Sequence, residues 1–291
     1  MACYKHFSKR DLFRQLTAFI ALVFISASTP ADLILTSPPR ESAAKGLLQY
    51  GPMADRLSEV LGEKVIYQHP KGWLFYQRDM RADKYDIIFD GPHFISWRIR
   101  QFGHTPVAKL PGKLVFFVIT AKDQTHINSL DDLVNHPVCG IAPPNLATLS
   151  ILAEYKNPSR QMKLVTPKGG MPGVYKAFKE GKCEAVILRD KFFSKQVPQQ
   201  ERDGLKSVFK SAALTNQGIS VSSRVSAEQQ ALIAAALTEV TDATAPTLKR
   251  FAPAAASMVP ASKEDYADQY KLLTGVIFGW EITNKEGMEA P

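Results

Sequence analysis

Short apolar runs alternate with longer segments of helical periodicity through the first third of the chain. Ile87, Ile88 and Phe89 form a continuous apolar run, short enough for a strand that is buried on both faces of a parallel sheet. The expected strands are 33–36, 64–68 and 85–89, and the expected helices between them are 43–61 and 73–80. Because strand–helix–strand units cross over right-handed and leave their strands parallel, this order predicts an α/β sheet.

The turn after this third strand brings a strand end close to a helix start. Asp90, Gly91 and Pro92 end the apolar run, and apolar residues then recur with helical spacing from Phe94 to Gly103. In open α/β sheets, ligands lie beyond the carboxyl ends of the strands, where the N-termini of helices point outward. We therefore expect residues 90–93 to form one wall of a small-molecule site.

The same alternation then repeats without a repeat in sequence. Expected strands are 105–110, 114–120, 138–141, 162–166, 185–188, 207–213 and 218–222, and expected helices begin near 128 and cover 147–155, 174–179 and 226–240. The rest of the chain is expected to be helical and interrupted by prolines. Two such units predict two lobes, residues 32–119 plus 215–291 and residues 120–214, each a mostly parallel sheet flanked by helices. A ligand cleft is expected between them.

The first 31 residues have the composition of a secretory signal peptide. Four basic residues between positions 5 and 14 precede an apolar segment at 16–27. Twelve residues of helix span only about 18 Å, against about 30 Å of bilayer hydrocarbon, so the segment is too short for an anchor. A buried N-terminal helix is the alternative. Cleavage after Ala27 or Ala31 would release an exported chain with no membrane-spanning segment.

Charge and cysteine content narrow the class of protein further. The formal charge is +8, and loss of four basic residues and Asp11 with the signal lowers it to +5. This excess is spread along the chain and is no nucleic-acid footprint. Without Cys3, the mature chain keeps Cys139 and Cys183, which could form a disulfide in an oxidising compartment or remain buried free thiols. No CxxC or His/Cys cluster is present, so neither a metal nor a cofactor is expected.

Five segments, in this order and spacing, carry a family resemblance. They are P-P-R-E at 38–41, M-A-D-R-L-S-E-V-L-G-E-K-V at 53–65, K-Y-D-I-I-F-D-G-P at 84–92, I-N-S-L-D-D-L at 127–133 and A-F-K-E-G-K-C-E-A at 177–185. The chain thereby resembles the phosphate/phosphite/phosphonate-type periplasmic binding proteins of ABC importers. The resemblance implies the two-lobed type 2 periplasmic binding protein fold. It also implies a monomeric periplasmic receptor that hands a small solute to a membrane permease.

The binding residues of that family carry over unevenly. An aromatic follows the second strand here, as Trp73, but Asp90 stands where the family often has tyrosine. The segment that matches the family's anion-wrapping Asp-Pro-Asn-Ser-Thr-Ser-Gly loop reads P-P-N-L-A-T-L at 143–149 and keeps only Asn145 and Thr148. The expected ligand is therefore a small polar or anionic solute of the phosphonate or oxyanion class, with phosphonate itself a doubtful member.

Five candidate site residues come from the first lobe: Arg40, Trp73, Asp90, Gly91 and His93. Arg40 could pair bidentately with an anion or be a solvated loop residue. Trp73 could be a wall of the site or a core residue, and Asp90 a ligand acceptor or a cap of the turn. His93 could donate to an anion, ligate a metal, or simply occupy the first helical turn.

Three candidates come from the second lobe: Asn145, Thr148 and Arg189. Asn145 and Thr148 could present donors to a ligand, although helix capping alone also explains them. Arg189 could bind an anion or form a surface ion pair with Asp190.

No catalytic motif is evident in the sequence. There is no GxSxG elbow, no Walker pattern and no dinucleotide-binding glycine pattern. We therefore expect a solute receptor and not an enzyme. The alternatives are a ligand-sensing receptor for a signalling histidine kinase, which would have the same fold, and an exported hydrolase or transferase.

Overall fold

The computed structural model describes residues 32–277 and residue 280. The predicted signal peptide and its cleavage sites at Ala27 and Ala31 lie outside the described residues. Among the described residues, no helix combines the length and the apolar composition needed to cross a bilayer.

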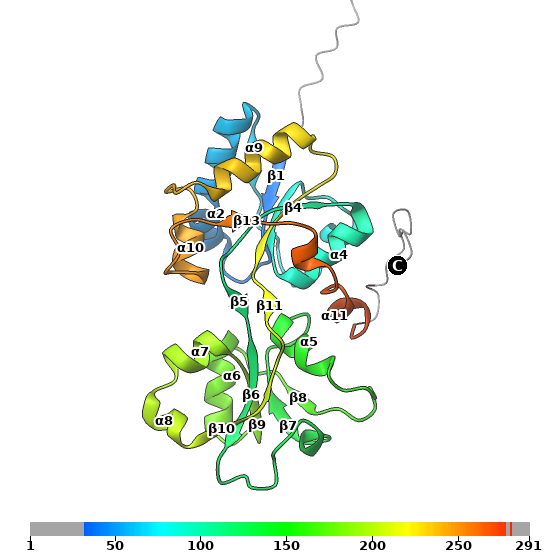
Figure 1. Ribbon diagram of the computed structural model, residues 1–291, viewed down its shortest axis with the longest axis vertical. Helices are drawn as coiled ribbons and strands as arrows, with labels where there is room; N and C mark the ends of the chain where they lie inside the picture. The colour runs from blue at the N-terminus through cyan, green and yellow to red at the C-terminus, as the bar shows by residue number, and fades with distance from the viewer. Residues whose placement is uncertain (1–31, 278–279, 281–291) are drawn as a thin grey trace, which may run out of the picture. The chain divides into compact units, whose positions relative to one another are not determined.

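The first sheet has six strands in the spatial order β13-β4-β12-β3-β1-β2 (Figure 1). They are β1 (Leu33–Thr36), β2 (Val65–Tyr67), β3 (Ile87–Asp90), β4 (Thr105–Lys109), β12 (Gly218–Val221) and β13 (Val259–Pro260). β1 pairs in parallel with β2 and β3, whereas β12 runs antiparallel to β3 and β4. The prediction for residues 259–260 was wrong. This segment was expected to be helical, but it forms β13, which pairs with β4 at the sheet edge.

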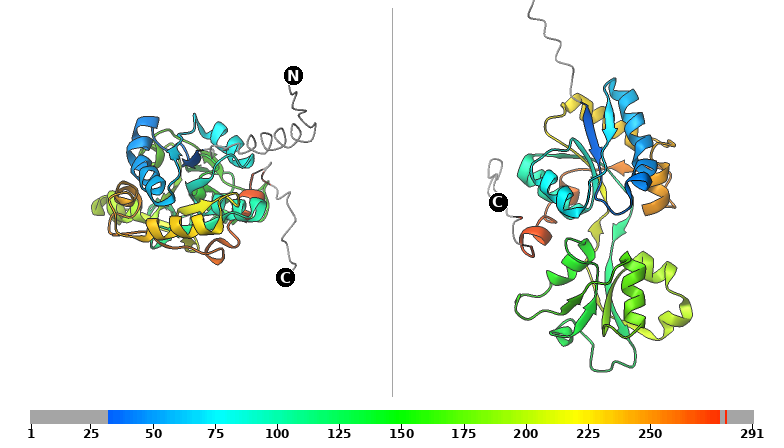
Figure 2. Two further views of the ribbon diagram at one scale, coloured as in Figure 1. Left: turned by 90° about the horizontal axis from the view of Figure 1, so that it is seen from above. Right: turned by 180° about the vertical axis from the view of Figure 1, so that it is seen from behind.

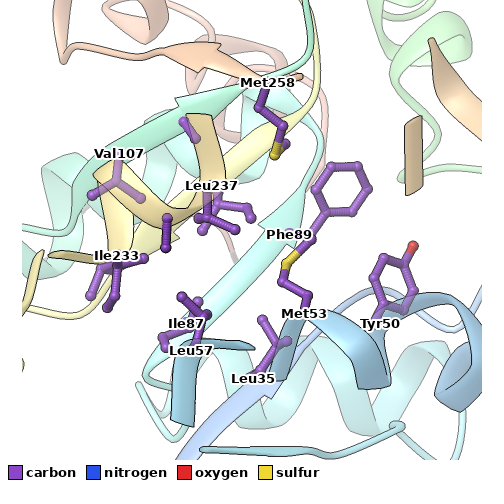
Figure 3. Close-up of a cluster of buried hydrophobic side chains, with 14 of the residues drawn as sticks. Leu35, Tyr50, Met53, Leu57, Ile87, Phe89, Val107, Ile233, Leu237 and Met258 are labelled. Carbon is purple, nitrogen blue, oxygen red and sulfur yellow. The ribbon is translucent and has the colours of Figure 1, made fainter. Parts of the chain in front are cut away.

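Helices cover both faces of this sheet, and together they form lobe 1. They are α2 (Ala43–Leu61), α3 (Trp73–Arg81), α4 (Pro92–Phe102), α9 (Ala227–Thr238) and α10 (Ala245–Phe251). Ile87 and Phe89 pack with α2 and α9 in one buried cluster (Figure 3), whereas Ile88 packs with α3 and α4 in another. The predicted strand is thus buried on both faces. Gly62 and Gly103, at φ 63° and 69°, end α2 and α4 in the left-handed conformation that favours glycine.

The second sheet has five strands in the order β10-β6-β9-β7-β8. It belongs to the part of the chain drawn in green to yellow in Figure 2. They are β6 (Phe116–Ala121), β7 (Pro137–Cys139), β8 (Lys163–Val165), β9 (Ala185–Arg189) and β10 (Leu205–Lys210). β7, β8 and β9 are parallel, while β6 and β10 run back in the antiparallel sense. With its helices this sheet forms lobe 2. These helices are α5 (Leu146–Leu152), α6 (Gly170–Lys179), α7 (Asp190–Gln196), α8 (Gln199–Asp203) and the short 3₁₀ turn η1 (Asp131–Leu133).

The chain crosses between the sheets at a two-stranded antiparallel pair, β5 (Lys113–Leu114) and β11 (Leu214–Thr215) (Figure 1). All of β6 belongs to the second sheet; the division into 32–119 plus 215–291 and 120–214 stays a prediction. The chain then returns through the 3₁₀ turn η2 (Glu264–Tyr266) to α11 (Lys271–Thr274). α11 contacts α4 in lobe 1 and α5 in lobe 2. Leu272 packs against a buried cluster of each lobe.

Several local features differ from the expectations. The helix expected near Asn128 is reduced to η1, because the Asp132 carboxylate accepts from the backbone N–H groups of Asn128 and Ser129 and closes a tight turn. The cysteine alternative is resolved: Cys139 and Cys183 form a disulfide within lobe 2.

Candidate ligand-binding site

A cleft of about 570 Å³ is lined by residues of both lobes. Its lining comprises loop and helix residues that follow β1, β2, β3, β7 and β8, the last residue of β9, and residues near the crossing strands. This volume is in the usual range for small-molecule sites. The strand-end location is the one expected for ligands of open α/β sheets.

Six of the eight predicted site residues line the cleft: Arg40, Trp73, Gly91, His93, Asn145 and Arg189. The structure brings them together from segments that are as far apart in sequence as the first loop of lobe 1 and the end of β9 in lobe 2. Asp90 and Thr148 lie behind the lining, and both are fully buried.

Asp90 is the centre of a buried charge network under the lobe 1 wall. Its Oδ2 lies 3.0 Å from Nη1 of Arg98, a fully buried arginine of α4, and accepts from the hydroxyl of Tyr76. Its Oδ1 accepts from the backbone N–H of Gly91 at 2.6 Å. Burial, with the Asp90 charge beside it, raises the pKa of Tyr76 well above its usual value, so its hydroxyl keeps its proton. The Asp90 carboxylate is therefore already satisfied by protein groups.

Arg40 supplies positive charge to lobe 1's side of the cleft. Its Nη2 lies 3.6 Å from Asp90 Oδ1, too long for a hydrogen bond, and its Nη1 is buried without a hydrogen-bond partner. Because Arg98 already balances the charge of Asp90, the positive charge of Arg40 is largely without a counter-charge among the described residues.

Arg189 supplies positive charge from lobe 2. It ends β9 and directly precedes α7. Its Nε and Nη2 are buried without hydrogen-bond partners, and the nearest carboxylate oxygen, of Asp190, is 4.0 Å from Nε. Burial lowers the pKa of Arg189 from its usual value, which reflects this incomplete solvation. Apart from Arg40 and Arg189, and with His93 neutral, the described residues that line the cleft carry no charge.

His93 lies in the first turn of α4 and reaches across to lobe 2. Its Nε2 is 3.0 Å from the carbonyl oxygen of Pro144, and its ring is 4.2 Å from that of Phe94. Burial lowers the pKa of His93 to about 4, so the imidazole is neutral near pH 7.

The lobe 2 loop is held by the two residues that sequence reasoning linked to helix capping. The side chain of Asn145 accepts from the N–H groups of Ala147 and Thr148 and caps α5. The Thr148 hydroxyl donates to the carbonyl of Ile141 at 2.6 Å. Between these anchors, the peptide bond joining Pro143 to Pro144 is cis.

The profile of the periplasmic substrate-binding proteins of phosphonate ABC transporters matches residues 35–266. The chain belongs to this family. Family membership implies a transport receptor and not an enzyme, a periplasmic location, and a small-molecule ligand with a permease partner. The predictions of family, two-lobed fold and solute-receptor role are confirmed. A comparison with curated proteins found no match.

Several solved structures share the fold of this substrate-binding protein. XAC2383 from Xanthomonas citri bound to ATP has a TM-score of 0.66 at 14% identity, with 84% of this chain and 96% of that chain covered. PhnD1 from Prochlorococcus marinus in complex with methylphosphonate has a TM-score of 0.60 at 11% identity, covering 82% and 96%. A binding protein component of an ABC phosphonate transporter from Pseudomonas aeruginosa has a TM-score of 0.58 at 13% identity, covering 82% and 84%.

Several residues of this phosphonate-type receptor's cleft escaped sequence reasoning. Gln77, Met171 and Gln217 line it, and Gln217 Oε1 is buried without a partner. Met171 lies in the first turn of α6, which begins four residues before the expected start at residue 174, and no pattern marked Gln217. Arg98 did have a signal, because it is a charged residue within the apolar recurrence of the helix 92–102.

Proposed function

We propose that the protein is a monomeric periplasmic receptor that binds a small organic anion between its lobes and delivers it to an ABC permease. The observation that carries the proposal is a pair of arginines, Arg40 and Arg189, that face the same cleft from opposite lobes. Both have buried N–H groups without partners. Buried donors of this kind cost stability unless a ligand satisfies them.

The charge of the cleft favours an anion over a cation. Guanidinium groups bind carboxylates, phosphonates and sulfonates through paired N–H donors. Asp90, the carboxylate nearest to Arg40, is paired with Arg98 and is fully buried, so it offers nothing to a cationic ligand. An anion held by one arginine from each lobe also favours a closed arrangement of the lobes over an open one.

The apolar part of the cleft favours an organic body on the anion. Its walls include three aromatic side chains, Trp73, Phe94 and Phe116, and a set of prolines and aliphatic residues, Pro39, Pro92, Pro143, Pro144, Leu114, Ile141 and Leu146. Trp73 packs edge-on against Tyr76 and is 38% exposed, which leaves part of its indole for a ligand. In this proposal Gly91, His93 and Asn145 also touch the ligand, while Asp90 and Thr148 position the groups that do.

Binding of acidic solutes to the purified mature protein tests the proposal. Calorimetry with small phosphonates, sulfonates and carboxylates should find binders, and Arg189→Met should weaken their binding at least tenfold, because one buried donor pair is lost. Arg160→Met is the matched control, since Arg160 is an exposed lobe 2 arginine outside the cleft lining. A preference for neutral or cationic solutes, or unchanged affinity in Arg189→Met, would overturn the proposal.

A sensory role with the same fold would leave these binding results unchanged. Delivery is tested separately, by measuring whether the liganded protein stimulates ATP hydrolysis by the permease encoded beside it. Stimulation of a histidine kinase in place of a permease would favour the sensing alternative.

A further inference from the structure

The imidazole of His93 is held in one tautomer by a contact with the opposite lobe. Its Nε2 lies 3.0 Å from the carbonyl oxygen of Pro144. A carbonyl oxygen can only accept, so Nε2 carries the proton and donates it. With the ring neutral, Nδ1 must then present a lone pair. Among the roles that the sequence left open for His93, this tautomer disfavours donation to an anion, since the remaining ring nitrogen accepts.

That lone pair has no partner within the protein. Nδ1 is buried and makes no hydrogen bond, although the residue is only 3% exposed and lines the cleft. A buried acceptor without a donor is costly, and native structures usually leave one only where a ligand or an ordered water completes it.

Gly91 keeps the approach to Nδ1 open. Its backbone is ordinary, with φ −73° and ψ 152°, so conformation does not require glycine at this position. Space does: a β-carbon here would lie 2.8 Å from Cε1 and 3.0 Å from Nδ1 of His93. A larger residue would displace the ring or cover its acceptor.

Burial keeps the ring neutral when an anion is absent, and the charges around the ring act in both directions. Arg40 and Arg98 oppose its protonation, and Asp90, which would favour it, is already paired with Arg98. Phe94 on the ring's own helix and Pro144 on the opposite lobe contribute no charge.

We propose that the ligand carries an O–H or N–H donor close to its anionic group, and that His93 Nδ1 accepts it. This inference deepens the proposed function and rests on it. Arg40 and Arg189 would bind the charge, while His93 would select hydroxylated, ammonium-bearing or singly protonated oxyanions over fully ionised anions that lack a donor. A site with a buried acceptor rejects the analogue without the donor, because the acceptor then stays unpaired.

Matched pairs of ligands test the inference. Sulfonates stay ionised near neutral pH, so 2-hydroxyethanesulfonate and ethanesulfonate differ only in the donor. We expect calorimetry to show at least tenfold tighter binding of the hydroxylated member by the wild type. The same comparison with 2-hydroxyethylphosphonate and ethylphosphonate includes an anion that can carry its own proton.

The pH dependence separates the two sources of the donor. If the donor is a separate hydroxyl, the preference for 2-hydroxyethanesulfonate should stay constant between pH 6 and pH 8. If the donor is a proton on the oxyanion, ethylphosphonate should bind more tightly as the pH falls through its second ionisation, whereas ethanesulfonate should not.

Two substitutions assign the preference to His93. His93→Phe keeps a ring but removes the acceptor, so the ratio of affinities within each pair should fall toward one. His93→Asn restores an acceptor near the position of Nδ1 and should recover part of the ratio. Because the readout is a ratio, a general weakening of binding in either variant cancels. Gly91→Ala retains both arginines and the histidine but crowds Nδ1, so it should lower the same ratio.

The outcomes separate this inference from the proposed function. If the wild type binds both members of each pair equally and shows no pH dependence, the role of Nδ1 is wrong while anion binding stands. A ratio that survives in His93→Phe would also overturn it. If no anion binds at all, the proposed function fails, and this inference fails with it.

Discussion

The two lobes present their charged groups to the cleft in different ways. In lobe 1, Asp90 is surrounded by Arg98, Tyr76 and the N–H of Gly91 before any ligand arrives. In lobe 2, Arg189 has two buried nitrogens without partners. The Asp90–Arg98 pair of lobe 1 is thus balanced by folding alone, whereas Arg189 of lobe 2, like Arg40 on the cleft side of lobe 1, leaves its charge for a ligand to balance.

This difference separates the buried Asp90–Arg98 pair, which contributes to stability, from Arg189, which contributes to binding. A satisfied buried charge network stabilises the fold that contains it, but its removal leaves an uncompensated charge. An unsatisfied buried group does the reverse, because it costs stability and gains energy when bound. Substitutions of equal size at Arg98 and at Arg189 should therefore have different consequences, the first mainly for stability and the second mainly for binding.

The largest effect is expected for Arg98→Met in lobe 1. It removes the cation that faces Asp90 and leaves a buried carboxylate without its partner, which should lower the free energy of unfolding by about 3–5 kcal/mol. Arg98 also donates to the Ser220 hydroxyl of β12 through Nε and Nη2, so these bonds are lost as well. Urea denaturation of the ligand-free protein measures the change.

Arg189→Met is the matched comparison in lobe 2. It should lower the free energy of unfolding by less than about 1 kcal/mol, because a partly buried guanidinium without hydrogen-bond partners contributes little to stability. Equal losses of stability in Arg98→Met and Arg189→Met would contradict the difference proposed between the two arginines. Adding Asp90→Asn to Arg98→Met should recover much of the stability, since the buried charge is then removed.

A second effect should be confined to lobe 2. The disulfide between Cys139 and Cys183 joins β7 to the residues before β9, 44 positions apart in sequence. Replacing both cysteines with alanine should lower the free energy of unfolding by about 2–4 kcal/mol. Hydrogen exchange should then speed up in β7, β8 and β9 and stay unchanged in β1 and β3. Faster exchange in both lobes would show that they unfold as a single unit.

The third effect is a loss of stability in acid that comes from His93. Its pKa is lowered from 6.5 to about 4 in the folded state, so the unfolded chain binds the proton first as the pH falls. The contribution is fully present above pH 6.5 and is lost as the pH falls toward 4, with about 2 kcal/mol lost between pH 7 and pH 5.

Urea denaturation at several pH values measures that slope. His104, whose pKa burial also lowers, contributes in the same direction, so His93→Phe is needed to isolate the part of His93. If His93→Phe has the same slope as the wild type, the ring does not stay neutral in the folded protein.

Most of the scaffold could be predicted from the sequence. The buried strand at Ile87–Asp90 and the stop at Gly103 follow from local patterns, namely an apolar run and a glycine after helical periodicity. The short strand β13 could not be predicted, because its Val259 and Pro260 pair only with a strand about 150 residues earlier, and local patterning does not encode such long-range pairing.

The candidate site was predictable in location but not in detail. Strand ends and helix starts pointed to Gly91, His93 and Asn145, which line the cleft. What the sequence could not show is that Asp90 faces inward to Arg98, because either side of a turn can carry a carboxylate. The tautomer of His93 likewise depends on Pro144, a residue of the other lobe.

The last described helix also has a mechanical consequence. Leu272 packs with apolar clusters of both lobes, and α11 contacts a helix of each. If one sheet rotates relative to the other, apolar side chains must slide past Leu272. Three segments of the chain, β5, β11 and α11, therefore restrain the hinge. The rates of solute binding and release then depend in part on the contacts of α11, close to the end of the chain.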